Sequence, residues 1–240
     1  MVLYCKGCLL SYTPNAGGAV LEAAKGTLLI LSALFPIVNP LGGSPIFLTL
    51  TNNYSPSARR ILSRQIAINS FFLLVGSYLI GTYILSFFGI SLPVVQVGGG
   101  LIVISTGWTM LLRKDEDEHG VETRENVSPQ EVYKNAFYPL TLPLTVGPGS
   151  ISVAITLGAN APRHHGWNFL AIFTALIGSV IVSVSIFLCY GFADRLAQLL
   201  GATGMSVIMR LSSFLLVCIG VQILWNGVKA LLATLPALGQ

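Results

Sequence analysis

The sequence predicts an all-α membrane protein with six transmembrane helices, arranged as two inverted three-helix repeats. Three observations support this prediction: a low content of charged residues, long stretches without any charge, and a three-proline motif that occurs twice. Only 9% of the 240 residues are Asp, Glu, Lys or Arg, against about 25% in an ordinary soluble domain. Apolar residues make up 53% of the chain. This composition argues against a soluble enzyme and against a nucleic-acid partner, and it predicts a protein whose main solvent is the lipid bilayer.

The charge-free stretches define the predicted spans. No charged residue lies between Lys25 and Arg59, or between Arg64 and Arg113. A membrane-spanning helix needs about 20 mostly apolar residues, so the second stretch is long enough for two crossings. The segment 88–93, which contains a glycine and a proline, predicts the turn between them. The six predicted spans are residues 26–52, 66–88, 93–112, 135–160, 167–193 and 208–232.

Two of these helices have marked beginnings. Ser55 precedes Pro56, and a serine followed by a proline is typical of a helix N-terminus. Ser128 stands three residues before Glu131, which is the spacing of a capping box. We therefore expect both helices to begin in water or among lipid headgroups and then to enter the bilayer.

The distribution of Lys and Arg predicts the orientation. The loops after the first, third and fifth spans hold eight basic residues, and the opposite side holds four. Cytoplasmic loops carry the excess of Lys and Arg, so both termini are predicted to lie outside the cytoplasm. The eight residues are Arg59, Arg60, Arg64, Arg113, Lys114, Arg124, Lys134 and Arg195.

A three-proline motif occurs in the first span and, at one constant offset, in the fourth. Three spans per copy is an odd number, so the second copy must insert upside down relative to the first. The chain is thus divided into an N-terminal segment (1–25), a first repeat (26–112), an acidic cytoplasmic linker (113–128) and a second repeat (129–240). The six prolines are Pro36, Pro40, Pro45, Pro139, Pro143 and Pro148.

These prolines predict that helices one and four are broken, because each proline removes a backbone donor and obstructs the preceding turn. Re-entrant hairpins are the alternative. Broken backbone is tolerated at membrane depth where it is buried in protein or lines a watery cavity. In inverted halves the two breaks would meet near the bilayer midplane, which predicts a substrate or ion site there. Half-helices are expected to restart at Ile46 and after Pro148.

The chemistry of such a site suits a small zwitterion. The first amides of a half-helix attract a carboxylate, and the carbonyls freed at a break suit an ammonium group or Na⁺. The predicted site residues are Asn39, Pro40, Gly42, Gly43, Ser44, Pro45, Thr141, Pro143, Thr145, Gly147, Pro148, Gly149 and Ser150.

Residues 39–47 resemble the NP-x-G-x-x-P-x-F signature of the MarC family of six-helix inner-membrane proteins. Residues 137–151 resemble its second signature, F-P-x-x-x-P-x-x-x-G-P-G-x-I. The patterns of its third and sixth helices also resemble residues here, although Gln96 and Ser213 stand where an arginine and a glycine are expected. Some members are described as transporters of glycine and alanine, so the resemblance implies transport of small neutral amino acids across the inner membrane.

The departure at Gln96 leaves Arg210 as the remaining charge of that pair. Arg210 can extend to the cytoplasmic headgroups from the start of span six. It can instead form a gate or substrate contact, as can Gln96 and Gln222. The sequence leaves both roles open.

The leading functional hypothesis is a secondary transporter that works by alternating access. No Asp or Glu lies between Lys25 and Arg113, which favours Na⁺ over H⁺ as the coupling ion. An exporter or a channel for other small neutral solutes is the alternative. The sequence lacks H-E-x-x-H and G-x-S-x-G motifs, so we expect no enzyme activity, no cofactor and no metal site. Whether the protein forms a homo-oligomer is left open.

Overall fold

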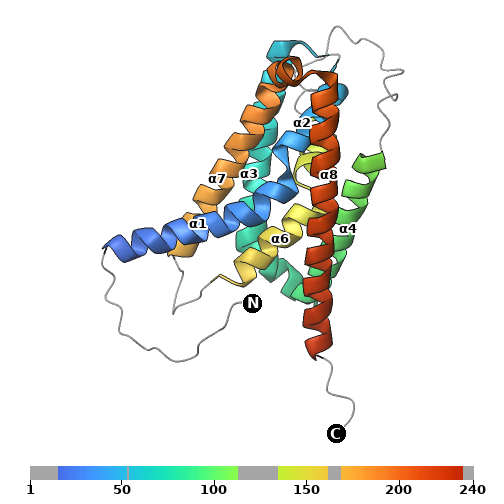
Figure 1. Cartoon of the computed structure of the whole chain (residues 1–240). Coiled ribbons are helices and arrows are strands. Elements are labelled where there is room, and N and C mark those ends of the chain that lie inside the picture. Colours follow the sequence, from blue (N-terminus) through green and yellow to red (C-terminus); the bar gives the residue numbers. More distant parts are fainter. Residues whose placement is uncertain (1–15, 53, 113–134, 162–168, 235–240) are drawn as a thin grey trace.

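The computed structural model describes residues 16–52, 54–112, 135–161 and 169–234, and within these ranges all regular structure is helical (Figure 1). The prediction of an all-α protein is confirmed for this part of the chain. In chain order the elements are α1 (Ala16–Val38), α2 (Pro40–Leu50), α3 (Pro56–Phe87), α4 (Leu92–Leu112), η1 (Ala136–Thr145), α6 (Pro148–Ala159), α7 (Phe169–Gly191) and α8 (Ala193–Thr234). η1 is a stretch of π-helix.

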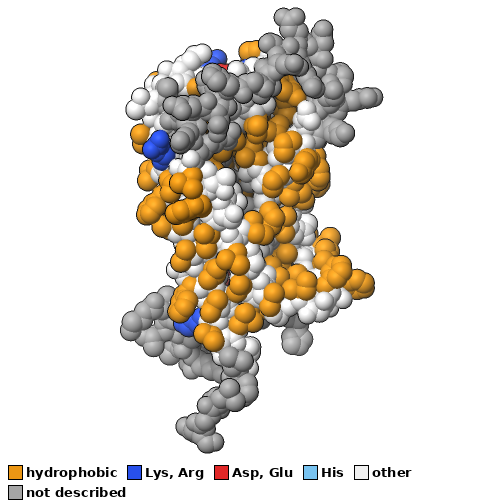
Figure 2. All heavy atoms as spheres, turned by 90° about the vertical axis from the view of Figure 1, so that its right-hand side faces the viewer, with side chains coloured by type: hydrophobic (Ala, Val, Ile, Leu, Met, Phe, Trp, Pro, Cys, Tyr) orange, Lys and Arg blue, Asp and Glu red, His pale blue; other side chains and the backbone are white. Residues whose placement is uncertain are grey.

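Five helical segments are long and apolar enough to cross a membrane, and the bent pair of η1 and α6 forms a sixth if it counts as one span. The predicted multi-pass arrangement is therefore confirmed at five to six spans. Large apolar side chains cover the outside of the molecule; Phe87, Phe169 and Leu199 are 84%, 83% and 82% exposed. Figure 2 shows such side chains over most of one face, with Lys and Arg toward its ends. Lipid solvates such a surface, whereas water would not.

One helix begins where predicted and another begins earlier. α3 begins at Pro56, as the serine–proline pair predicts and ahead of the predicted membrane span 66–88, because the Ser55 hydroxyl accepts a hydrogen bond from the Ala58 amide at 3.2 Å and caps the helix. α1 begins at Ala16, inside the expected N-terminal segment 1–25, where Ala, Leu, Glu and Lys favour helix. The predicted capping box at residues 128–131 and the linker 113–128 lie outside the described residues.

The predicted turn between the second and third spans is confirmed. α3 ends at Phe87 and α4 begins at Leu92. Gly89 between them has φ 68°, a conformation that glycine adopts at little cost. The two helices therefore run antiparallel with a short connection.

α3 and α7 pack together in the middle of the molecule, and α1 crosses α7 steeply inclined to the other helices (Figure 1). The contact between α3 and α7 buries aliphatic side chains completely, among them Leu62 and Ile66 of α3 and Val182 and Ile186 of α7. α7 also packs against α2, the helix that follows the first proline motif (Figure 1).

α4 and α8 lie side by side, with their backbones in contact at glycines (Figure 1). A Cβ at Gly100 would lie 2.6 Å from the Leu224 amide nitrogen, and one at Gly220 would lie 2.8 Å from the Ile104 amide nitrogen. Small residues permit such close approach of membrane helices. Ser213, at a predicted glycine position, is fully buried opposite Gly107. A Cβ at Gly107 would lie 2.9 Å from the Ser213 carbonyl oxygen, so this glycine also lets the two backbones approach.

Candidate functional site

The first proline motif is interrupted at a single residue, Asn39, between α1 and α2. Asn39 has φ 48° and ψ 60°, a left-handed conformation that Asn tolerates better than most residues. Its Oδ1 atom accepts a hydrogen bond from the Gly42 amide at 3.1 Å and caps α2. Because Pro40 has no N–H, the carbonyl of Pro36 lacks its usual helical partner four residues later.

The expected restart of a half-helix at Ile46 is wrong. α2 begins at Pro40 and contains Pro45, because an asparagine cap followed by proline at the first helical position starts a helix directly. The Ser44 hydroxyl donates a hydrogen bond to the Cys189 carbonyl of α7 at 3.1 Å. This bond fixes α2 against α7.

The second proline motif is interrupted over a longer stretch, η1 and its link to α6. Tyr138 has φ −128° and ψ 124°, and Leu142 has φ −107° and ψ 125°. Both precede a proline, and residues in that place favour extended backbone. Their peptide bonds to Pro139 and Pro143 are cis. α6 then begins at Pro148, as predicted, and is bent by 68° relative to η1.

Threonine hydroxyls supply hydrogen bonds in η1, where the prolines provide no donors. Thr141 Oγ1 donates to the Ala136 carbonyl at 2.6 Å, and Thr145 Oγ1 donates to the Leu140 carbonyl at 2.7 Å. Both threonines are buried. An intramolecular hydrogen bond contributes about 0.5–1.5 kcal/mol, so these two hydroxyls stabilise the irregular backbone. Asn69 Nδ2 of α3 donates to Thr141 Oγ1 at 3.4 Å.

Tyr190 of α7 contacts both interruptions. Its hydroxyl lies 3.1 Å from Thr145 Oγ1, and it is the donor because the Thr145 proton is directed to the Leu140 carbonyl. Its ring stacks on Phe47 of α2, with centroids 4.7 Å apart. A Cβ at Gly43 would lie 2.5 Å from the Tyr190 hydroxyl oxygen. Glycine at this position therefore lets α2 approach the tyrosine.

A cavity of about 510 Å³ lies between the two interruptions and α4. Its volume falls within the range of small-molecule sites, about 300–1,000 Å³. Aliphatic side chains and prolines form most of its wall. The polar residues on the wall are Asn39, Ser105, Thr106, Thr109, Thr145 and Ser150.

The side-chain amide nitrogen of Asn39, Nδ2, belongs to a residue of the cavity wall. This atom is buried and has no hydrogen-bond partner within the described ranges. An amide nitrogen offers two donors, so a carboxylate or carbonyl oxygen of a ligand would satisfy it. Gly149 and Ser150, in the first turn of α6, also line the cavity. The N-terminal amides of a helix attract negative charge.

Close packing of α4 against α6 closes one side of the cavity. A Cβ at Gly99 would collide with the side chain of Ser152, and a Cβ at Gly149 would collide with the side chain of Val103. In the other direction, the wall extends to Leu50, the last residue of α2, and to Met110, near the end of α4. The basic segments of the chain follow these two helix ends.

The structure places eight of the predicted site residues on the cavity wall: Asn39, Gly43, Pro143, Thr145, Gly147, Pro148, Gly149 and Ser150. Five others, Pro40, Gly42, Ser44, Pro45 and Thr141, belong to the same two motifs but do not line it. Gln96, Arg210 and Gln222 lie outside this wall. Gln222 is exposed and donates to Asn226 Oδ1 at 3.0 Å. The gate role of these three residues stays a prediction.

Sequence reasoning missed two contributions to this site. Ser105, Thr106 and Thr109 of α4 face the cavity, and their spacing of one, three and four residues is a signal for one helix face. Tyr190 gave no such signal, because the sequence does not show which of the apolar and small polar residues of α7 face the two interruptions.

Fold and cavity together define the class: a multi-pass helical membrane protein with a small-molecule-sized cavity where two helices are interrupted. Residues 25–232 match the family model described as "MarC family integral membrane protein". The chain therefore belongs to the MarC family, which confirms the resemblance seen in the two proline motifs.

This chain aligns with several membrane proteins over almost their full length. The UPF0056 membrane protein YvbG of Bacillus subtilis is 30% identical over 208 residues, which are 87% of this chain and 96% of that protein. The UPF0056 inner membrane protein MarC of Salmonella typhimurium is 31% identical over 220 residues, 90% of this chain and 99% of that protein. A UPF0056 membrane protein of Methanocaldococcus jannaschii is 30% identical over 205 residues. No solved structure matches the chain significantly.

Proposed function

We propose that the protein is a secondary transporter that moves small neutral amino acids, such as glycine and alanine, across the inner membrane by alternating access. The proposal rests mainly on one observation. A cavity between the two interrupted helices combines an unpaired Asn39 amide with the first turn of α6 and a mostly apolar wall. The proposal includes no catalytic step and no cofactor.

The packing between elements supports two inverted halves. α3 packs on α7 and α4 on α8, which pairs the second and third helices of the two halves. α2 packs on α8 as α6 packs on α4, and α1 packs on α7 as η1 packs on α3. α2 and α6 both begin near the middle of the molecule and run toward opposite ends (Figure 1). In each of these contacts, an element of one half packs on an element of the other half. Inverted repeats with two broken crossings would produce this arrangement.

The groups at the cavity favour a small zwitterion as the substrate. The Asn39 amide and the first amides of α6 would bind its carboxylate. The hydroxyls of Thr106 and Thr145, which line the cavity, are acceptors for its ammonium group. The apolar remainder of the wall has no partner for a charged side chain. A bulky or charged amino acid would therefore bind worse than glycine or alanine.

Sodium is the coupling ion that we propose, with H⁺ as the alternative. Among the described residues that form the cavity wall, none is Asp or Glu. A proton relay through membrane helices normally uses such side chains. Backbone carbonyls at helix breaks can coordinate Na⁺ without a carboxylate.

The proposal is tested with purified protein in liposomes. Radiolabelled glycine and alanine should accumulate or exchange with saturation, and an imposed Na⁺ gradient should increase the initial rate more than an H⁺ gradient. Absence of uptake and of exchange under both gradients, from protein shown to be folded, would exclude these substrates. Competition by unlabelled leucine and glutamate measures the size and charge limits of the cavity.

An exporter for small neutral solutes is the second candidate, and the shape of the cavity favours it. The cavity extends toward the ends of α2 and α4 that precede the basic segments, and α4–α6 packing closes the opposite side. If the basic segments are cytoplasmic, as predicted, this conformation receives substrate from the cytoplasm. Liposomes with sorted orientations and preloaded glycine distinguish efflux from uptake. Current without saturation would instead indicate a channel.

A further inference from the structure

A second concave surface lies at the end of the molecule where α3 begins and α7 meets α8. This groove has a volume of about 1020 Å³. Arginines Arg59, Arg60 and Arg64 of α3 and Arg195 of α8 line it, together with one acidic residue, Asp194. The proposed transport cavity shares none of these residues.

The arginines of the groove have two different roles. Arg59 forms an ion pair with Asp194 and donates to the Thr51 carbonyl at 3.1 Å, so it connects α3 with α8 and with the end of α2. Arg60 and Arg64 are exposed, stand one helical turn apart on α3 and form no ion pair within the described ranges. The groove therefore has an excess of positive charge that the described residues do not neutralise.

Apolar side chains complete the wall. Ile61 is 53% exposed and Phe192 is 42% exposed, and both line the groove beside the arginines. The guanidinium carbon of Arg195 lies 5.5 Å from the centroid of the Phe192 ring. A ligand that fits such a wall has an anionic part and an apolar part.

The groove lies at headgroup depth. α3 has 32 residues, or about 48 Å of helix at 1.5 Å per residue, and the hydrocarbon layer is only about 30 Å thick. The first turns of α3 must therefore project beyond the hydrocarbon. Arg60 and Arg64 lie in these first turns, while Ile61 and the aromatic side chains continue into the apolar surface of the spans.

We propose that this groove binds an anionic phospholipid. Its phosphate would contact Arg60, Arg64 and Arg195, and its acyl chains would lie along Ile61 and Phe192. Basic pockets between membrane helices recognise acidic lipid headgroups in this way. A free phosphate would use the arginines alone, whereas a lipid also uses the exposed apolar side chains. Because the lipid connects the start of α3 with the α7–α8 junction, its binding stabilises the fold.

The test uses the full-length protein in detergent, with lipid binding measured by native mass spectrometry and unfolding followed by temperature. Phosphatidylglycerol should bind and should raise Tm, and phosphatidylcholine with the same chains should do neither to a comparable degree. The double variant Arg60→Gln/Arg64→Gln should bind phosphatidylglycerol about 30-fold more weakly, since each basic group near an anionic surface is worth about a fivefold change. The variant Arg60→Lys/Arg64→Lys should retain most of the binding.

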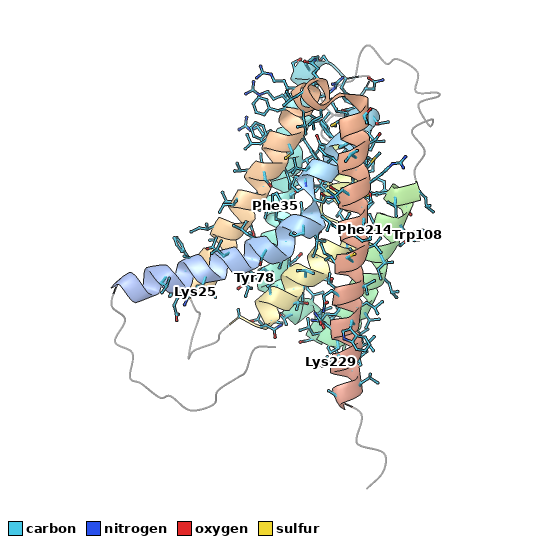
Figure 3. The ribbon with its side chains drawn as sticks, viewed as in Figure 1. Lys25, Phe35, Tyr78, Trp108, Phe214 and Lys229 are labelled. Carbon is cyan, nitrogen blue, oxygen red and sulfur yellow. The ribbon has the colours of Figure 1, made fainter. Side chains whose placement is uncertain are left out.

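Lys25 and Lys229 provide a matched control, because both lie away from the groove, in the lower half of the molecule (Figure 3). The double variant Lys25→Gln/Lys229→Gln removes the same charge and should bind phosphatidylglycerol as the unaltered protein does. Equal binding by the Arg60→Gln/Arg64→Gln variant would overturn the proposal. So would a Tm increase with inorganic phosphate or glycerol phosphate that equals the increase with phosphatidylglycerol. Neither result depends on transport, so both are independent of the proposed function.

Discussion

The two interruptions begin from the same spacing of prolines and reach different structures. The first is confined to Asn39, whose side chain caps the next helix while its backbone changes direction. The second extends over η1, where two threonine hydroxyls bond to carbonyls five residues earlier. The residues between the prolines cause the difference. An asparagine before Pro40 starts a helix at once, whereas the leucine before Pro143 has no group that can cap one.

The two interruptions also differ in their attachment to α7. α2 donates a hydrogen bond from Ser44 to the carbonyl of Cys189, and η1 accepts one at Thr145 from the hydroxyl of Tyr190. A compact break with its own cap needs little help from outside. A long irregular segment depends on side chains from its neighbours, so we expect the second interruption to be the more sensitive to hydrogen-bond removal.

The largest effect is expected from filling the glycines beside each break. Gly43→Leu places atoms on the Tyr190 hydroxyl, and Gly147→Leu places them on the Pro143 carbonyl, which a Cβ would already approach to 2.9 Å. Each should reduce the initial rate of glycine transport to about 1%, because overpacking displaces the cavity wall. Gly76→Leu is the control, since no atom lies within 4 Å of a Cβ there. Transport that is retained in either variant would show that the interruption beside that glycine does not line the substrate path.

The next largest effect is expected at Asn39. Asn39→Ala removes the cap of α2, which is worth about 1 kcal/mol. It also places an alanine, whose side chain cannot form a local hydrogen bond, in left-handed backbone, which costs about 1 kcal/mol more. Tm should fall by about 4–8 °C, and the KM for glycine should rise about tenfold because a donor to the substrate is lost.

Asn39→Gly separates the two roles of this residue. Glycine accepts φ 48° without strain and costs only a few tenths of a kcal/mol as a cap. It should therefore restore Tm almost fully but leave the KM raised. If KM returns with Tm, Asn39 acts on the fold alone.

A smaller effect should distinguish the two attachments to α7. Thr145→Val removes the hydroxyl bond to the Leu140 carbonyl and leaves the buried Tyr190 hydroxyl without its partner, at a cost of about 1–3 kcal/mol. Ser44→Ala removes one bond to a carbonyl that already belongs to a helix, so it should cost about 0.5 kcal/mol. Thermal unfolding in one detergent compares the two directly. An equal loss of Tm would mean that η1 is no more dependent on α7 than α2 is.

The smallest effect is expected at Arg210. Arg210 is exposed and lies outside the cavity wall. Arg210→Gln should leave the KM for glycine within about twofold, as expected of a side chain that extends to the headgroups. A tenfold rise in KM would instead make Arg210 a substrate or gate contact in another conformation.

The sequence predicted an all-helical protein with five to six membrane spans, whereas two broken crossings in inverted halves stay a prediction. Long stretches without charge indicate contact with lipid. Proline removes a backbone hydrogen-bond donor from a helix wherever it occurs. The form of each interruption was less accessible. The restart at Pro40 could have been predicted from Asn39 as a cap, and the polar face of α4 from the spacing of Ser105, Thr106 and Thr109.

Other parts of the site had no signal of their own. Tyr190 lies in an apolar span, and its importance depends on how α7 is rotated against α2 and η1. Rotation of a helix follows from tertiary packing, such as the fit of Gly43 against the tyrosine hydroxyl. A single sequence contains the residues of this contact, but it does not show that they touch one another.

The glycine contacts between α4 and α8 have a consequence for the synthesis of the protein. α4 precedes η1, α6 and α7 in the chain, and its partner α8 leaves the ribosome after all the other described helices. Until then the glycine face of α4, at Gly100 and Gly107, has only lipid or the insertion machinery beside it. A chain that stops before α8 would insert most of its helices and still expose this face, which makes it a recognisable client for membrane proteases.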